Sequence, residues 1–189
     1  MHQLDKLIEL CPPPELPLDC LTGSEWIAQF RRLGTRLPEQ LVQLNLRYGT
    51  GHFESIQSPV NASFSLHCSA VSSYAISRLA ELRLHKLKRP KAFPATLYFE
   101  PNGLLPIGQI GSGVDICLRV SGDNPDKWQI SLLRATTNDV HHLNSSLLEF
   151  SAEVIAGSLQ SPVFSRYLPT TKGYRFISCR ESVQCWHAG

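Results

Sequence analysis

Apolar residues recur every three or four positions in the first part of the chain, and this spacing predicts amphipathic helices. Thr22 and Glu25 have the spacing of a capping box, which opens a short helix containing Trp26. Pro38 then occupies a first-turn position, where its missing N–H costs nothing, and Gly49 ends the helix that follows. The apolar stripe of this second helix comprises Leu37, Leu41, Leu44 and Tyr48.

The longest helical pattern covers residues 71–88, and Pro90 ends it. Its two adjacent apolar stripes are Val71, Ala75, Leu79 and Leu82, and Ile76, Ala80, Leu84 and Leu87. Together these stripes predict a broad buried face. A second capping box, Ser146 with Glu149, opens a last helix that Gly157 ends.

Between these two helices the pattern changes to that of strands. Residues 96–99 are strong strand formers, and 101–103 form a Pro-Asn-Gly turn. Apolar and polar residues alternate over 115–120, which predicts a half-buried strand, and the alternation restarts at Trp128. A further strand is expected at 174–177. Strands joined by turns, without intervening helices, imply antiparallel pairing.

The composition is that of an ordinary globular protein, with 42% hydrophobic and 18% charged residues among 189. This length predicts one domain with short extensions. Eighteen basic residues against sixteen acidic ones give a net charge of +2, which is too weak for a protein that binds nucleic acid by neutralising phosphates.

The near-neutral total hides opposite local charges. Residues 1–25 carry −4, residues 78–91 carry +5 and residues 115–157 carry −3. The basic stretch either complements the dipole at the end of the long helix or forms a contact surface for an acidic partner. A polarised surface of this kind suits a protein that binds another protein.

The sequence also bears on the compartment. No run reaches the ~20 apolar residues of a membrane span, and the first residues lack the features of a signal peptide, so a cytoplasmic location is expected. The chain is long enough to fold without bridges, and its scattered cysteines are expected to be thiols in a reducing cytosol. A structural pair among the terminal ones stays open. The six are Cys11, Cys20, Cys68, Cys117, Cys179 and Cys185.

No group of residues predicts catalysis, a metal or a cofactor. The three glycines of 108–113 precede a strand, whereas a phosphate loop must lead into a helix N-terminus. His141 and His142 are adjacent and diverge, and the tail that contains Cys185 and His187 has no known zinc spacing. We therefore expect a protein that is not an enzyme. An enzyme would become possible again if other candidate side chains converged in the folded chain: His67, Cys68 and Cys117, or the two adjacent histidines.

Several segments together resemble a known family. Residues 37–41 (Leu-Pro-Glu-Gln-Leu) are followed by 48–51 (Tyr-Gly-Thr-Gly), and 101–108 read Pro-Asn-Gly-Leu-Leu-Pro-Ile-Gly. Residues 122–128 read Gly-Asp-Asn-Pro-Asp-Lys-Trp, and the helix from Leu147 closes the pattern. In order and spacing these segments resemble the SUKH superfamily, which is named after yeast cell-wall synthesis regulators and bacterial immunity proteins.

The resemblance implies an α+β fold, a single domain with helices packed against one face of a mostly antiparallel, curved sheet. It divides the chain into three parts. Residues 1–21 form an acidic, Pro-rich N-terminal lead-in, residues 22–164 the SUKH-like domain, and residues 165–189 a C-terminal extension.

The resemblance also implies a function. Bacterial members are typically cytosolic immunity proteins that bind and block a cognate toxin, often a nuclease, in polymorphic toxin systems. The expected partner is thus a toxin domain, with neither nucleic acid nor membrane bound directly and no cofactor. The alternative is a regulatory or scaffold protein of the cell-wall-synthesis-regulator type. Binding is expected through the sheet edge, the loops around Gly111, and Asp115, Asp123, Asp126, Lys127 and Trp128. For Trp128, at the start of a strand, the alternative of a core position is favoured over an interface.

Overall fold

The computed structural model describes residues 3–56, 63–93, 95–111, 113–161 and 173–179, and the described residues form five α-helices and seven strands. The helices are α1 (Gln3–Leu10), α2 (Gly23–Leu33), α3 (Glu39–Tyr48), α4 (Val71–Lys88) and α5 (Leu147–Ile155). The strands are β1 (Gly51–Ser55), β2 (Phe64–Leu66), β3 (Leu104–Ile110), β4 (Val114–Arg119), β5 (Gln129–Arg134), β6 (Asp139–His142) and β7 (Tyr174–Ser178). The expected α+β class is confirmed.

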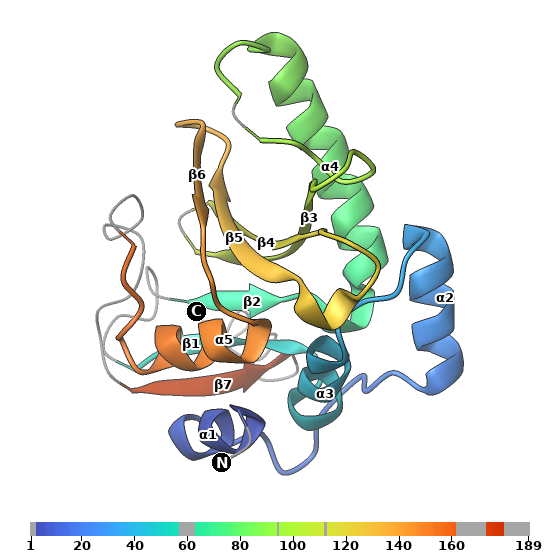
Figure 1. The fold of residues 1–189 in the computed structure, drawn as a ribbon. Coiled ribbons are helices and arrows are strands. Elements are labelled where there is room, and N and C mark those ends of the chain that lie inside the picture. The colour runs from blue at the N-terminus through green and yellow to red at the C-terminus, as the bar shows by residue number, and fades with distance from the viewer. Residues whose placement is uncertain (1–2, 57–62, 94, 112, 162–172, 180–189) are drawn as a thin grey trace, which may run out of the picture.

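All seven strands belong to one antiparallel sheet in the order β6-β5-β4-β3-β2-β1-β7. The sheet is strongly curved, since β5 and β6 stand nearly upright in Figure 1 while β1, β2 and β7 run across the view. Close approach of β2 and β3 requires Gly108, because a Cβ there would lie 2.1 Å from the Ser65 carbonyl oxygen.

Helices cover both faces of the sheet, and not the single face implied by the resemblance. On one face, Phe64 of β2 contacts Phe150 of α5, with ring centroids 6.3 Å apart. On the other face, Arg78 of α4 binds Asp115 of β4. Strand β4 is therefore buried on both sides, and the prediction of a half-buried strand over 115–120 is wrong for residues 115–118.

Local signals predicted the helix boundaries well. Thr22 and Ser146 each form the expected capping box, and α4 has the predicted bounds. Pro38 lies at the N-cap of α3, one position before the helix. The predicted stripe of α3 is buried, with Leu37, Leu41, Leu44 and Tyr48 each no more than 3% exposed.

The broad buried face predicted for α4 is only half correct. The first stripe is buried: Val71, Ala75, Leu79 and Leu82 are all 1% exposed or less. The second stripe lies at the surface, where Ile76 is 46%, Leu84 57% and Leu87 75% exposed. Figure 1 shows the reason, because the far end of α4 extends beyond the sheet and α2 packs only near its beginning.

The strand predicted over 96–99 is wrong. Leu97 forms a single bridge to Leu104, and the chain then turns, with Phe99 at φ +73°. Polar contacts to helices fix this segment: the Tyr98 hydroxyl donates to the Leu33 carbonyl at 2.8 Å, and Arg83 donates to the Tyr98 carbonyl at 2.8 Å. High strand propensity is overridden by tertiary contacts here.

Both segments that flank residues 22–164 contribute to the fold. Helix α1, within the Pro-rich lead-in, packs on α5 and buries Leu7 completely. The Tyr48 hydroxyl donates to the Cys11 carbonyl at 2.7 Å. Strand β7 lies within 165–189, at the position expected for the last strand, and pairs with β1. The segment 50–69, with the composition of loop or weak strand, contains β1 and β2.

Candidate functional site

Two of the five residues proposed from the sequence to bind a partner lie inside the structure. Asp115 is 0% exposed, and Trp128 is 3% exposed with its indole N–H donating to the Gly122 carbonyl at 3.2 Å. Neither side chain is exposed for contact with a partner, so both are corrections to the predicted site. For Trp128 the alternative of a core position is the one observed.

The remaining three residues lie on an exposed turn that also stabilises the fold. Asp126 accepts a hydrogen bond from the backbone N–H of Glu39 at 2.7 Å, which satisfies a free donor at the start of α3. Asn124 in turn accepts from the Asp126 N–H at 3.1 Å. Asp123 and Lys127 are exposed beside this contact. The turn therefore links β5 to α3 and presents polar side chains around this contact.

The buried carboxylate has an arginine partner that the sequence did not indicate. Arg78 grips Asp115 with two bonds, Nε to Oδ1 at 2.8 Å and Nη2 to Oδ2 at 2.9 Å, and its Nη1 reaches Glu81 at 2.5 Å. The bond to Asp115 raises the pKa of Arg78 and keeps the guanidinium charged. This pair joins α4 to the centre of the sheet, and its role is structural.

The nucleophile and metal candidates do not converge. His142 and His141 make separate contacts, to Ser131 at 2.8 Å and Ser161 at 2.5 Å. Burial raises the pKa of the Cys68 thiol to about 12, which keeps it protonated at neutral pH. Burial likewise raises the pKa of Cys117. His67 stacks on Tyr74 with ring centroids 3.9 Å apart.

Within the described ranges, no three histidine, cysteine or acidic side chains are placed to hold a metal ion. Cys11, Cys20, Cys68 and Cys117 are free thiols. Cys185 and His187 lie outside the described residues. In the same described part of the chain, no helix has the length and hydropathy needed to cross a membrane.

A surface feature stands out instead on α4. We define the outer stripe of α4 as Ile76, Ala80, Leu84 and Leu87, all exposed. A further apolar side chain, Phe99, is 64% exposed beside this helix, and the Arg83 guanidinium carbon lies 5.7 Å from its ring centroid. An apolar side of a helix that no element of the described chain covers is typical of a contact surface.

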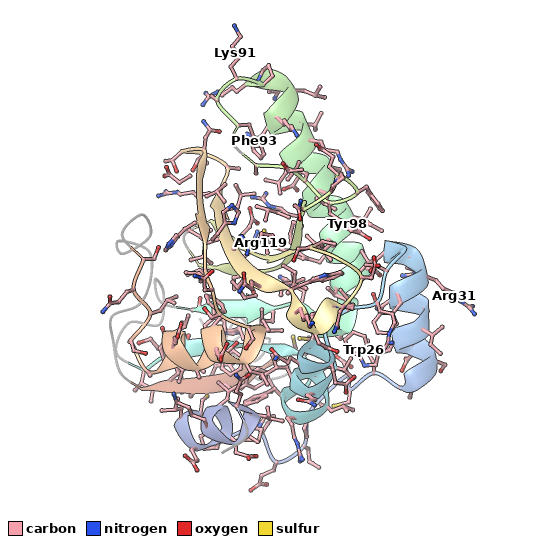
Figure 2. The ribbon with its side chains drawn as sticks, viewed as in Figure 1. Trp26, Arg31, Lys91, Phe93, Tyr98 and Arg119 are labelled. Atoms are coloured by element: carbon pink, nitrogen blue, oxygen red, sulfur yellow. The ribbon has the colours of Figure 1, made fainter. Side chains whose placement is uncertain are left out.

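Positive charge surrounds the far end of this stripe. We define the basic end of α4 as Arg83, Lys88, Arg89 and Lys91, for which no ion pair forms with any described residue. Lys91 lies at the extreme of the molecule in Figure 2. The neighbouring Lys86 is paired with Glu100 at 3.1 Å, so part of the positive charge of this region is neutralised and the rest faces solvent.

Comparison with known proteins adds no relative. No family model matches the chain, and no match was found among curated proteins or among solved structures. The resemblance to the SUKH superfamily therefore stays a prediction based on the quoted segments alone.

Proposed function

We propose that this chain is a non-catalytic protein-binding domain that contacts its partner through the outer stripe and the basic end of α4. The observation that carries the proposal is the exposure of Ile76, Leu84 and Leu87 on a helix whose opposite side is core. Leaving three large apolar side chains in water gives up the favourable free energy of burying them, which a partner would recover. Charged residues around an apolar centre are the usual anatomy of an interface.

The chemistry of the surface defines the partner. The cations Lys88, Arg89 and Lys91 favour a protein with an apolar patch bordered by carboxylates, because complementary potentials speed association and disfavour other partners. Such an interface weakens as salt is added, since exposed charges are screened beyond about 8 Å at physiological ionic strength. The proposed surface thus replaces the acidic turn predicted from the sequence.

Within this class of protein, the resemblance to the SUKH superfamily supports a cytosolic immunity protein that binds and neutralises a cognate toxin. Immunity proteins against basic nucleases would be expected to present acidic surfaces. The basic end of α4 instead favours a toxin domain whose contact surface is acidic. The chain's own contribution is occlusion of the toxin, which needs no catalytic group.

The test is co-expression with the toxin encoded by the neighbouring gene. We expect the wild-type chain to protect cells and to form a complex with the toxin in pull-down. The double variant Leu84→Ser/Leu87→Ser is expected to fold and to lose both protection and binding. The matched control is Leu16→Ser/Leu46→Ser, which removes two leucines that are 82% and 52% exposed elsewhere on the surface.

Each outcome of this experiment tests one claim: the immunity function, the α4 surface or the role of the basic end. Failure of the wild-type chain to protect or to bind contradicts the immunity function. Protection that survives in the α4 variant, at wild-type strength, contradicts the assignment of the surface. A complex that does not weaken between low and physiological salt contradicts the role of the basic end.

A further inference from the structure

A polar cleft of about 470 Å³ lies on the sheet face that α4 also covers. Its wall is the segment 95–104, and its floor is the end of β4 and the edge strand β6. This volume falls within the range of small-molecule sites, roughly 300–1,000 Å³. The polar side chains that line it are Thr96, Asn102, Arg119, Ser121 and His142.

The sheet register places the two nitrogen-bearing side chains of the floor on the same face. Arg119 of β4 is opposite Gln129 of β5, and two residues along β5, Ser131 is opposite His142 of β6. Alternate residues of a strand share a face. Ser131 hydrogen-bonds the Nδ1 atom of His142 at 2.8 Å, which fixes the imidazole at the edge of the cleft.

Arg119 is a partly buried cation without a counter-charge. The only hydrogen bond its guanidinium makes among the described residues is to Gln129 Oε1, which is neutral, and no ion pair reaches it from that part of the chain. None of the described residues that line the cleft carries a carboxylate. By contrast, Arg78 on the same face is gripped by Asp115. Figure 2 shows Arg119 near the centre of the molecule, well away from the exposed Arg31.

The surroundings keep His142 uncharged near neutral pH. Burial, and then the positive charge of Arg119 and the neighbouring His141, lower the pKa of His142. The cleft therefore offers one permanent cation, a neutral imidazole, an amide and two hydroxyl groups. This set matches an oxyanion: a guanidinium binds phosphate or carboxylate through two parallel bonds, and the neutral groups donate or accept the remaining ones.

We propose that this cleft binds a small molecule carrying a phosphate or carboxylate group, with Arg119 as its anchor. The anion supplies the counter-charge that the described chain does not. Thr96, Asn102 and Ser121 lie where they can hydrogen-bond its remaining oxygens. This site is separate from the α4 surface and does not depend on the protein-binding proposal.

The experiment is a titration of the full chain, followed by amide NMR shifts at constant ionic strength, with inorganic phosphate and, separately, with succinate. We expect saturable shifts at Thr96, Asn102 and His142. Tighter binding of phosphate assigns a phosphorylated ligand, and tighter binding of succinate assigns a carboxylate ligand. The absence of a saturable response to either probe overturns the proposal.

Two arginine variants provide the control. Arg119→Gln is expected to weaken binding at least tenfold, because a charge-assisted bidentate contact is lost. Arg31→Gln removes the same charge from the exposed surface of α2 and should leave binding unchanged. If Arg119→Gln does not fold, Arg119→Lys keeps the charge but loses the planar fork, and should bind severalfold more weakly than wild type. Equal affinity of the folded Arg119 variant and wild type overturns the assignment.

Discussion

The two sides of α4 carry similar residues and have opposite fates. Val71, Ala75, Leu79 and Leu82 are buried against the sheet, whereas Ile76, Ala80, Leu84 and Leu87 face solvent. Hydrophobicity does not distinguish the two stripes. Their positions do: the inner side packs on β3 and reaches β4 through Arg78, and the outer side meets no element of the described chain along most of its length. A helical apolar pattern thus identifies surfaces able to be buried, and the rest of the fold decides which of them are.

Charged residues of the same helix repeat this contrast. Arg78, at the edge of the inner side, is 19% exposed and fixed by Asp115. Arg83 lies over an exposed aromatic ring and donates to a backbone carbonyl. The inner arginine is held by a buried carboxylate, whereas the outer one is held by a backbone carbonyl and lies at the surface.

The largest effect should come from a pair of leucine truncations that tests this contrast directly. Leu82→Ala removes a side chain that is 0% exposed and should lower the free energy of unfolding by about 2–5 kcal/mol. Leu84→Ala, two residues away on the outer side, should cost less than about 0.5 kcal/mol. Urea unfolding of both variants measures the difference, and similar losses would mean that the outer stripe is buried in solution.

A smaller loss of stability is expected when the ion pair on the inner side of α4 is broken. Asp115→Asn leaves Arg78 partly buried without its main counter-charge and should cost about 3 kcal/mol, at the lower end for such pairs because Glu81 and some solvent access remain. Glu81→Gln, which removes the exposed partner of the same arginine, should cost under about 1 kcal/mol. Thermal unfolding of the two variants compares their losses of stability. A larger loss from Glu81→Gln than from Asp115→Asn would contradict the assignment of Asp115 as the main partner of Arg78.

The smallest effect concerns pH. Burial lowers the pKa of His67, which stacks on Tyr74 of α4, so the folded chain holds this imidazole neutral where the unfolded chain would protonate it. The contribution of His67 to the free energy of unfolding is therefore fully present above its unfolded pKa of about 6.5. It is lost as the pH falls from there through the folded pKa.

The variant His67→Phe keeps an aromatic ring against Tyr74 and removes this proton. Its free energy of unfolding should fall less than that of wild type between pH 7 and pH 5. The free energy of unfolding of the variant should still depend on pH, because burial also lowers the pKa of His52 and His142. Identical slopes for variant and wild type would show that His67 is not buried in solution.

The features predicted correctly from the sequence are those that local interactions determine. The capping boxes at Thr22 and Ser146 and the span of α4 depend on residues within one or two turns. The alternation in β4 and β5 was enough to predict strands, and their joining turns were enough to predict antiparallel pairing.

The features that were missed depend on distant partners. Asp115 looked like a surface acid because its arginine lies 37 residues earlier, on a different element. Residues 96–99 have strand formers, but Arg83 binds the Tyr98 carbonyl, which a strand neighbour would otherwise bind, and the Tyr98 hydroxyl binds Leu33. The cleft around Arg119 arises from three segments that only the folded sheet brings together, so no single motif could predict it.

The pairing of β1 with β7 has a consequence for synthesis of the protein. Glu54 and Arg175, which face each other across these strands, are separated by 121 residues, so the partner of β1 is synthesised long after β1 itself. Closing so long a loop is slow, and an unpaired strand edge is a template for aggregation. The nascent chain therefore carries one open edge of its sheet until β7 emerges.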